Sequence, residues 1–211
     1  MPTFTDAKRE RVRESLRDAG REFFGRYGID KTTISELTKT AEIGKGTFYQ
    51  FYDSKEELYI DIIEQYLEEY IPRLLSNSFE AYDDPEKAIE AYLEESMDEL
   101  NSNPLLRQLF LDDDVNQLLE QFSDEELSEG HERSVEFFLP YIEQWYDESK
   151  VTGPDPETIA HTLRLVTRLE FSKEHVGRER YPAVRDTLIS AVAAGITDGT
   201  DESPYSEDHH E

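Results

Sequence analysis

Residues 33–59 read T-I-S-E-L-T-K-T-A-E-I-G-K-G-T-F-Y-Q-F-Y-D-S-K-E-E-L-Y, and this stretch decides the fold class. The pattern predicts two short helices joined by a tight turn, followed by the start of a third helix. The apolar residues of the first short helix share one side: Ile34, Leu37 and Ala41. In the second, Phe48 and Tyr52 lie four residues apart, opposite small and hydrogen-bonding side chains. A helix anchored by two aromatic residues that presents donors outward suits a DNA groove, as in a helix-turn-helix.

A longer motif surrounds this stretch, over residues 9–60. It follows A-x-x-x-F-x-x-x-G-x-x-x-T-T, then the helix-turn-helix, then T-[FL]-Y-x-x-F-x-[SN]-K-[ED]-x-L. The residues that meet it are Ala19, Phe23, Phe24, Tyr27, Gly28, Thr32, Thr33, Thr47, Phe48, Tyr49, Ser54, Lys55, Glu56 and Leu58. On these residues the segment resembles the DNA-binding domain of the TetR family of transcriptional regulators.

Two positions depart from the family pattern. Glu42 stands where the family often has a turn glycine, so we expect a non-glycine residue in the left-handed conformation. Gly44 replaces the frequent serine cap of the second short helix, and glycine is an acceptable N-cap.

The resemblance and the helical periodicity together predict an all-α fold of about nine helices. We expect a three-helix DNA-binding domain over residues 1–53, a helical effector-binding and dimerisation domain over 54–198, and an acidic, disordered tail over 199–211. Pro72 is expected to kink or end the helix that opens at Ser54. Later helices are expected from Pro85, over about 156–176 and over about 182–197.

The resemblance also implies which residues contact DNA: Thr33, Lys45, Gly46, Thr47, Tyr49, Gln50 and Lys55. Gln50 can pair with adenine through two hydrogen bonds, and Lys45 can bind either guanine or phosphate.

The other contacts follow from size and hydrogen-bonding capacity. Gly46 lets the protein backbone approach the DNA closely, and Thr47 can contact a phosphate or a thymine methyl group. Tyr49 and Lys55 are expected to bind phosphate. Thr33 is expected to cap the first short helix. For every one of these residues the alternative is a solvated helix face, whereas Phe48 and Tyr52 are expected in the core.

The rest of the chain is expected to sense a ligand and to form a homodimer, on the resemblance. The candidate pocket residues are Met97, Phe110, Phe138, Tyr141, Trp145, Arg168 and Phe171. Aromatic residues at helical spacing are more often plain core. Arg164 and Arg168, one turn apart, could bind an anionic ligand, although pairing with nearby carboxylates is the more ordinary outcome. The expected dimer contacts are Leu188, Ala191, Val192, Gly195 and Ile196, in the last two helices; an intramolecular core is the alternative.

The net charge of −27 comes from 49 acidic and 22 basic residues. Residues 1–60 hold 11 of each sign, so the remainder carries the whole excess and the DNA-facing end is relatively positive. Such an acidic surface favours a halophilic source, since molar salt screens the mutual repulsion. An acidic protein from an ordinary cell is the alternative.

Several chemistries lack a signal in the sequence. Cysteine is absent, which excludes disulfides and thiolate ligands. No signal peptide, membrane span, nucleophile elbow or phosphate loop is present, so we expect a cytoplasmic protein that is not an enzyme. The scattered histidines define no metal site, and no cofactor is expected. The alternative function is an architectural or protein-docking helix-turn-helix module without effector control.

Overall fold

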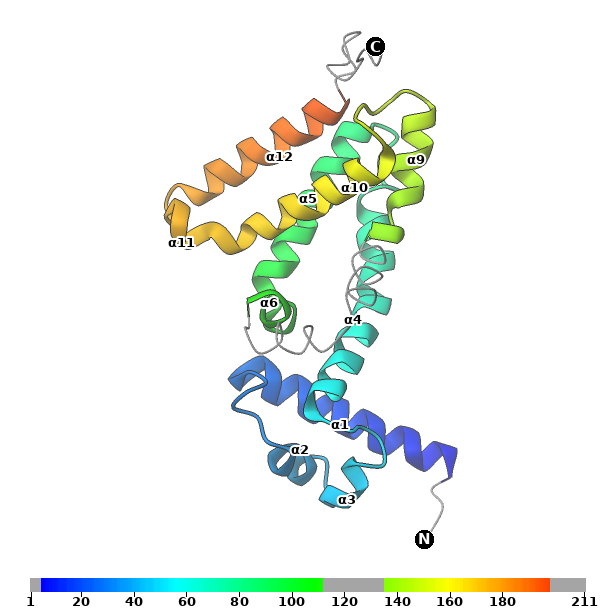
Figure 1. The fold of residues 1–211 in the computed structure, drawn as a ribbon, viewed down its shortest axis with the longest axis vertical. Helices are drawn as coiled ribbons and strands as arrows, with labels where there is room; N and C mark the ends of the chain where they lie inside the picture. Colours follow the sequence, from blue (N-terminus) through cyan, green and yellow to red (C-terminus); the bar gives the residue numbers. More distant parts are fainter. Residues whose placement is uncertain (1–4, 112–134, 198–211) are drawn as a thin grey trace, which may run out of the picture. The chain divides into compact units, whose positions relative to one another are not determined.

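The computed structural model describes residues 5–111 and 135–197. Within them every regular element is helical, which confirms the predicted all-α class (Figure 1). The elements are α1 (Asp6–Tyr27), α2 (Ile34–Thr40), α3 (Lys45–Phe48), α4 (Lys55–Asn77), α5 (Pro85–Ser102), α6 (Pro104–Leu111), α9 (Leu139–Asp147), α10 (Pro156–Thr167), the 3-10 helix η1 (Arg168–Ser172), α11 (Lys173–Val176) and α12 (Tyr181–Thr197). None of the helices described here is long and apolar enough to cross a membrane.

The described chain divides into two compact units. The first contains residues 5–70 and 103–111, and the second contains residues 71–102 and 135–197. Helix α4 therefore begins in the first unit and ends in the second, while α6 returns to the first. The segment 112–134 and the tail predicted over 199–211 lie outside the described residues.

The first unit is built on apolar side chains from α1 to α4. Those with no exposed surface are Leu16, Phe24, Leu37, Phe48, Leu58 and Tyr59. Phe24 of α1 and Tyr59 of α4 meet edge to face, with ring centroids 5.7 Å apart. The Tyr59 hydroxyl donates to the Leu105 carbonyl (2.7 Å), which joins α6 to the same core.

Local signals for helix ends are confirmed. Thr33 forms a capping box with Glu36 at the start of α2. Glu42 has a φ of 54°, so the residue in place of the turn glycine does adopt the left-handed conformation. Gly44 is the N-cap of α3, and α5 begins at Pro85 as expected.

The second unit is organised around α5. Ile89 and Leu93 are fully buried on this helix, as are Leu163 of α10 and Ala193 of α12. The Arg185 guanidinium of α12 binds the Asp98 carboxylate (2.7 Å) and donates to the Glu94 carbonyl (2.8 Å), both on α5. Apolar packing against α5 and the two Arg185 interactions together hold α12 on α5.

Two helices end elsewhere than the sequence suggested. Of the two effects expected of Pro72, a kink or an end, the end does not occur, because α4 continues through Pro72 to Asn77. Proline removes one N–H and one helical hydrogen bond, and burial of Tyr70 and Leu74 on either side offsets that loss. The helix expected over 156–176 winds into η1 at Arg168, where the buried Glu170 carboxylate accepts a hydrogen bond from Tyr181 (2.6 Å).

Candidate nucleic-acid interface

Helix α3 presents polar side chains on one face and buries aromatic ones on the other. Lys45, Tyr49 and Gln50 are exposed, Tyr49 to 55%, whereas Phe48 is fully buried and Tyr52 is 5% exposed. Hydrogen bonds such as that from Tyr52 N to Phe48 O extend the helical turn beyond the last residue of α3. The core positions predicted for Phe48 and Tyr52 are confirmed, and the polar face is open to a partner.

Neither the packing nor the backbone conformation at position 46 requires glycine. A Cβ atom added there would meet no other atom within 4 Å. Gly46 is exposed and its φ lies outside the range that favours glycine. The absence of a side chain thus leaves room on the exposed face, while Thr47 beside it is half-buried.

Thr33 and Lys55 both have structural contacts in the first unit. The Thr33 hydroxyl accepts from Glu36 N and donates to the Glu36 carboxylate (2.7 Å), so its expected capping role is confirmed. Lys55 Nζ donates to the carbonyl oxygens of Ile29 (2.6 Å), Asp30 (3.3 Å) and Thr32 (3.1 Å). These three bonds tie the start of α4 to the loop before α2, a role that the sequence did not indicate.

A carboxylate on α4 joins three parts of the first unit. Asp61 accepts two parallel bonds from the Arg17 guanidinium of α1, both of 2.8 Å. It also accepts a hydrogen bond from the Tyr52 hydroxyl (2.5 Å), at the end of the turn that continues α3. We call residues 45–52, which are α3 and the turn that continues it, the recognition segment. The Asp61 side chain therefore fixes α1, this segment and α4 to each other.

The electrostatics of this cluster favour its charged form. Partial burial raises the pKa of Asp61, but the hydrogen bonds from Arg17 and Tyr52 outweigh burial and leave the pKa below its usual value. Hydrogen bonding to Asp61 raises the pKa of Arg17, and burial followed by the bond to Asp61 raises that of Tyr52. All three groups thus keep the protonation states that the cluster needs at neutral pH.

Three of the expected effector-pocket residues meet around a side chain that the sequence did not single out. Phe79 has its ring centroid 5.6 Å from Phe138, 5.2 Å from Tyr141 and 5.4 Å from Trp145. Phe138 is fully buried, and the Tyr141 hydroxyl donates to the Glu80 carboxylate (2.7 Å). The cluster is packed and aromatic.

The other expected pocket residues lie on different elements of the second unit, except one. Met97 is buried on α5, while Arg168 and Phe171 are half-buried on η1. Phe110 belongs to α6 of the first unit, but its side chain lies outside the described part of the chain.

The expected dimer residues lie on α12, away from its buried side. Ile189 and Ala193 are buried, whereas Ala191 and Gly195 are exposed. Leu188, Val192 and Ile196 are half-buried. Sequence reasoning missed three exposed apolar residues: Leu165 on α10, Leu169 on η1 and Val184 on α12. The i, i+4 spacing of the two leucines was a signal that could have identified them.

Comparisons with known proteins agree with this geometry. Residues 16–62 match the family model described as "Bacterial regulatory proteins, tetR family". An uncharacterized HTH-type transcriptional regulator of Bacillus subtilis is 25% identical, covering 86% of this chain and 93% of its own. The HTH-type transcriptional repressor NemR of Escherichia coli is 36% identical over 63 residues, which are 30% of this chain and 32% of NemR.

The fold also has solved counterparts. A TetR-family transcriptional regulator from Pectobacterium atrosepticum superimposes with a TM-score of 0.67, at 21% identity, covering 89% of this chain and 93% of that one. This likeness concerns the fold alone. Residues 16–62 are thus similar to the DNA-binding domain of the TetR family, and the comparisons over the wider chain are with transcriptional regulators.

Proposed function

We propose that the protein is a homodimeric repressor that leaves its operator when a small-molecule effector binds the second unit. The observation that carries the DNA-binding part is the exposed polar face of α3 above buried Phe48 and Tyr52. NemR, which is similar in the DNA-binding segment, is itself a repressor. In this proposal residues 1–53 read DNA, residues 54–198 bind effector and dimerise, and the cell compartment is the cytoplasm.

Each exposed residue of the α3 face has a proposed role. Gln50 and Lys45 read base edges in the major groove, and Gly46 permits close approach of the backbone. Tyr49, Thr47 and Thr33 bind phosphate and fix the register. Lys55 can add a phosphate contact only by exchanging one of its three carbonyl partners, so we assign it the weakest share.

Helix α4 provides the route for effector control. Asp61 ties its first half to α1 and to the end of the recognition segment, and its last residues belong to the unit that contains the expected pocket. An effector that favours one tilt of α4 shifts the population between states that can and cannot span two half-sites. Those half-sites lie about 34–36 Å apart along DNA.

The test is binding to the DNA upstream of the protein's own gene. We expect wild type to prefer a site within it over a scrambled duplex by about 1,000-fold or more. Replacing Gln50 with Ala should relax the preference at one base pair by about 1–3 kcal/mol, because a bidentate contact is lost. Fluorescence anisotropy with systematically varied duplexes measures both quantities, and Lys87→Ala on the exposed side of α5 is the control.

A second candidate, the architectural or docking module, predicts a different result. Binding would then be indifferent to sequence, and changes at Gln50 and Lys45 would lower overall affinity without altering base preference. That outcome would replace the repressor proposal.

We also propose that the protein comes from a halophilic cell, whose salt-rich cytoplasm favours an acidic protein surface. Support comes from the excess of acidic over basic residues, 49 to 22, since repulsion between them weakens as the Debye length falls from about 10 Å at 0.1 M to about 3 Å at 1 M. The melting temperature should therefore rise steadily as KCl increases from 0.1 to 3 M, by roughly 10 °C or more. A melting temperature that is flat, or highest at low salt, contradicts this origin.

A further inference from the structure

Arg9, near the start of α1, differs from three arginines that follow it on the same helix. Arg13, Arg17 and Arg21 each form an ion pair of 2.7 to 3.3 Å with a carboxylate of α1 or α4. Arg9 is exposed and makes no ion pair with any carboxylate in the part of the chain that the structure describes. Its positive charge is therefore available to another molecule.

The Arg9 side chain is nevertheless held in one place. Its guanidinium lies over the ring of Phe51, with the central carbon 5.0 Å from the ring centroid. A guanidinium within about 6 Å of an aromatic centroid is attracted by the negative face of the ring. None of its N–H groups donates to an acceptor within the described residues. The contact thus positions the charge and its donors without neutralising or using them.

The ring that holds Arg9 belongs to the recognition segment. Phe51 N donates to the Phe48 carbonyl (2.9 Å), so Phe51 lies on the helical turn that continues α3. Its position in that turn places it between the exposed polar face and the side that buries Phe48 and Tyr52, close to Thr47. Phe51 is itself half-buried. Arg9 therefore lies at the edge of the polar face and not at its centre.

The edge of this face is where a phosphate is expected. A helix in the major groove directs its central residues at base edges, while the two sugar-phosphate backbones border the groove on either side. A guanidinium suits phosphate because its paired N–H donors match two phosphate oxygens. Residues 1–60 hold 11 acidic and 11 basic side chains, so attraction to DNA depends on where single cations are placed.

We propose that Arg9 binds a phosphate of the DNA backbone that borders the major groove entered by α3, and that Phe51 positions the guanidinium for this contact. Helix α1 then contributes directly to DNA binding, in addition to supporting the helix-turn-helix. This inference rests on the proposed function, since it adds a contact to the same DNA-binding surface.

The first test is the salt dependence of DNA binding. The probes are the labelled duplex from upstream of the protein's own gene and a scrambled duplex of the same length. KCl is varied over concentrations at which circular dichroism shows a folded protein. Each phosphate contact contributes about −0.9 to the slope of log K against log salt. Arg9→Gln, which removes one contact from each protomer of the dimer, should therefore make the slope shallower by about 2 on both duplexes.

The same variant has two further expected results. Operator affinity should fall by about 10-fold or more at the lowest salt of the series, because charge-assisted hydrogen bonds are lost. Base preference should stay the same, since a phosphate contact carries no sequence information. The melting temperature should fall by no more than about 2–4 °C, so the loss of affinity is not a loss of folding.

Arg11→Gln is the matched control. Arg11 is exposed on the same helix and also has no ion pair in the described chain, but it lies about 200° further round the helix. We expect it to change the slope by less than half as much as Arg9→Gln, whereas Arg9→Lys, which keeps the charge, should retain the wild-type slope. A slope for Arg9→Gln that equals the wild-type slope or that of Arg11→Gln overturns the inference.

The second test measures the coupling between Arg9 and Phe51. Phe51→Leu keeps an apolar side chain and removes the ring. We expect it to weaken operator binding by about 2–10-fold more in the presence of Arg9 than in the Arg9→Gln background, because an unsupported guanidinium must be ordered when DNA binds. Any other effect of the leucine occurs in both backgrounds and cancels in the comparison. Equal losses in the two backgrounds would show that Phe51 does not position Arg9.

The two duplexes separate this inference from the proposed function. A shallower slope for Arg9→Gln on both duplexes, in a wild type that prefers neither, supports the phosphate contact and refutes the sequence-specific repressor. A wild type that prefers its operator, with an unchanged slope for Arg9→Gln, refutes only the phosphate contact. A wild type that binds neither duplex refutes both.

Discussion

Replacing Asp61 with Asn is expected to destabilise the DNA-binding unit by about 2–3 kcal/mol, which lowers its melting temperature by roughly 5–10 °C. The substitution keeps the shape of the side chain but turns one acceptor into a donor and removes the charge that two Arg17 bonds and the Tyr52 bond require. Arg17 is only 14% exposed, and without Asp61 its guanidinium keeps only the longer contacts with Glu10 (3.7 Å) and Glu14 (3.4 Å). Operator affinity should fall with it, since Tyr52 fixes the recognition segment. Calorimetry and anisotropy measure the two effects.

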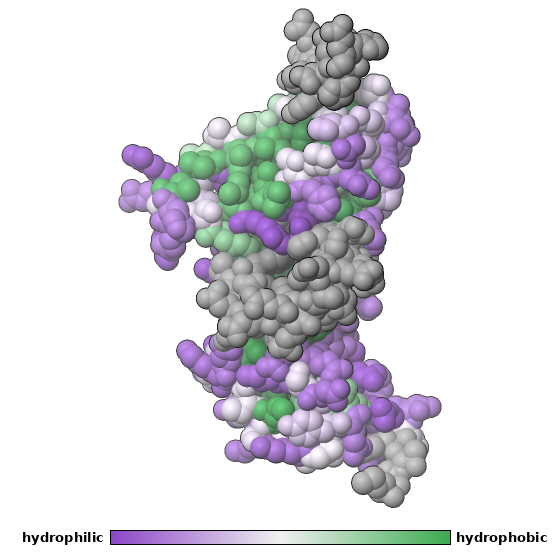
Figure 2. All heavy atoms as spheres, viewed as in Figure 1, coloured by the Kyte–Doolittle hydropathy of each residue, from purple (hydrophilic) through white to green (hydrophobic). Residues whose placement is uncertain are grey.

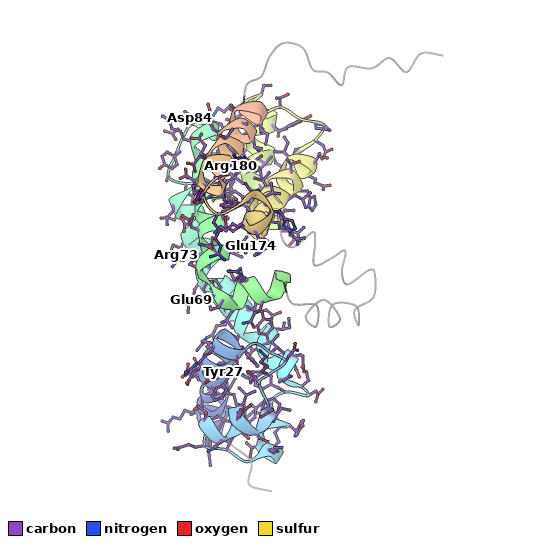
Figure 3. The ribbon with its side chains drawn as sticks, turned by 90° about the vertical axis from the view of Figure 1, so that its left-hand side faces the viewer. Tyr27, Glu69, Arg73, Asp84, Glu174 and Arg180 are labelled. Carbon is purple, nitrogen blue, oxygen red and sulfur yellow. The ribbon has the colours of Figure 1, made fainter. Side chains whose placement is uncertain are left out.

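The control for this change is Glu69→Gln, an exposed carboxylate further along α4 (Figure 3), which should alter the melting temperature by less than about 1 °C. Acid titration gives an independent check. Because the folded pKa of Asp61 lies below its unfolded value of about 3.9, its contribution is present above that pH and is lost as pH falls through the folded pKa. The gap between wild type and Asp61→Asn should therefore close in strong acid. A gap that does not narrow at all as the pH falls below the unfolded pKa contradicts this account.

The features that the sequence predicted correctly depend on residues that are close to each other along the chain. The capping box at Thr33, the N-cap at Gly44 and the left-handed Glu42 involve residues no more than a few positions apart. The alternation of buried and exposed residues on α3 follows from helical period alone. These signals were sufficient to predict the all-α class and the short helix with one polar and one buried face.

What the sequence did not predict depends on residues that are distant along the chain. Arg17 and Asp61 are 44 positions apart, and many other acidic residues were equally plausible partners. Lys55 matched a motif position expected to face phosphate, yet its Nζ reaches carbonyl oxygens 23 to 26 residues earlier. Phe79 lies between helices α4 and α5, so no helical stripe marked it as the centre of an aromatic cluster. Pairing of this kind requires the three-dimensional packing.

Changing both Leu165 and Leu169 to Glu is expected to convert the proposed dimer into a monomer. The two side chains are 58% and 42% exposed, and with Val184 on α12, which is 46% exposed, they belong to an apolar surface over α10 and α12 (Figure 2). Burying two leucines in a dimer contributes about 3–6 kcal/mol, so the dissociation constant should rise at least about 100-fold. Analytical ultracentrifugation measures this change.

The monomer should remain folded, because neither leucine contributes to the buried core of its own unit. Tyr82→Glu is the matched control, since it places a carboxylate on an exposed apolar residue elsewhere in the second unit and should leave the dimer intact. A single protomer can hold only one half-site, so operator affinity should fall by at least about 100-fold while affinity for an isolated half-site stays the same. A double variant that sediments as wild type would place the dimer contact on another surface, and the residues expected on α12 would then need a different role.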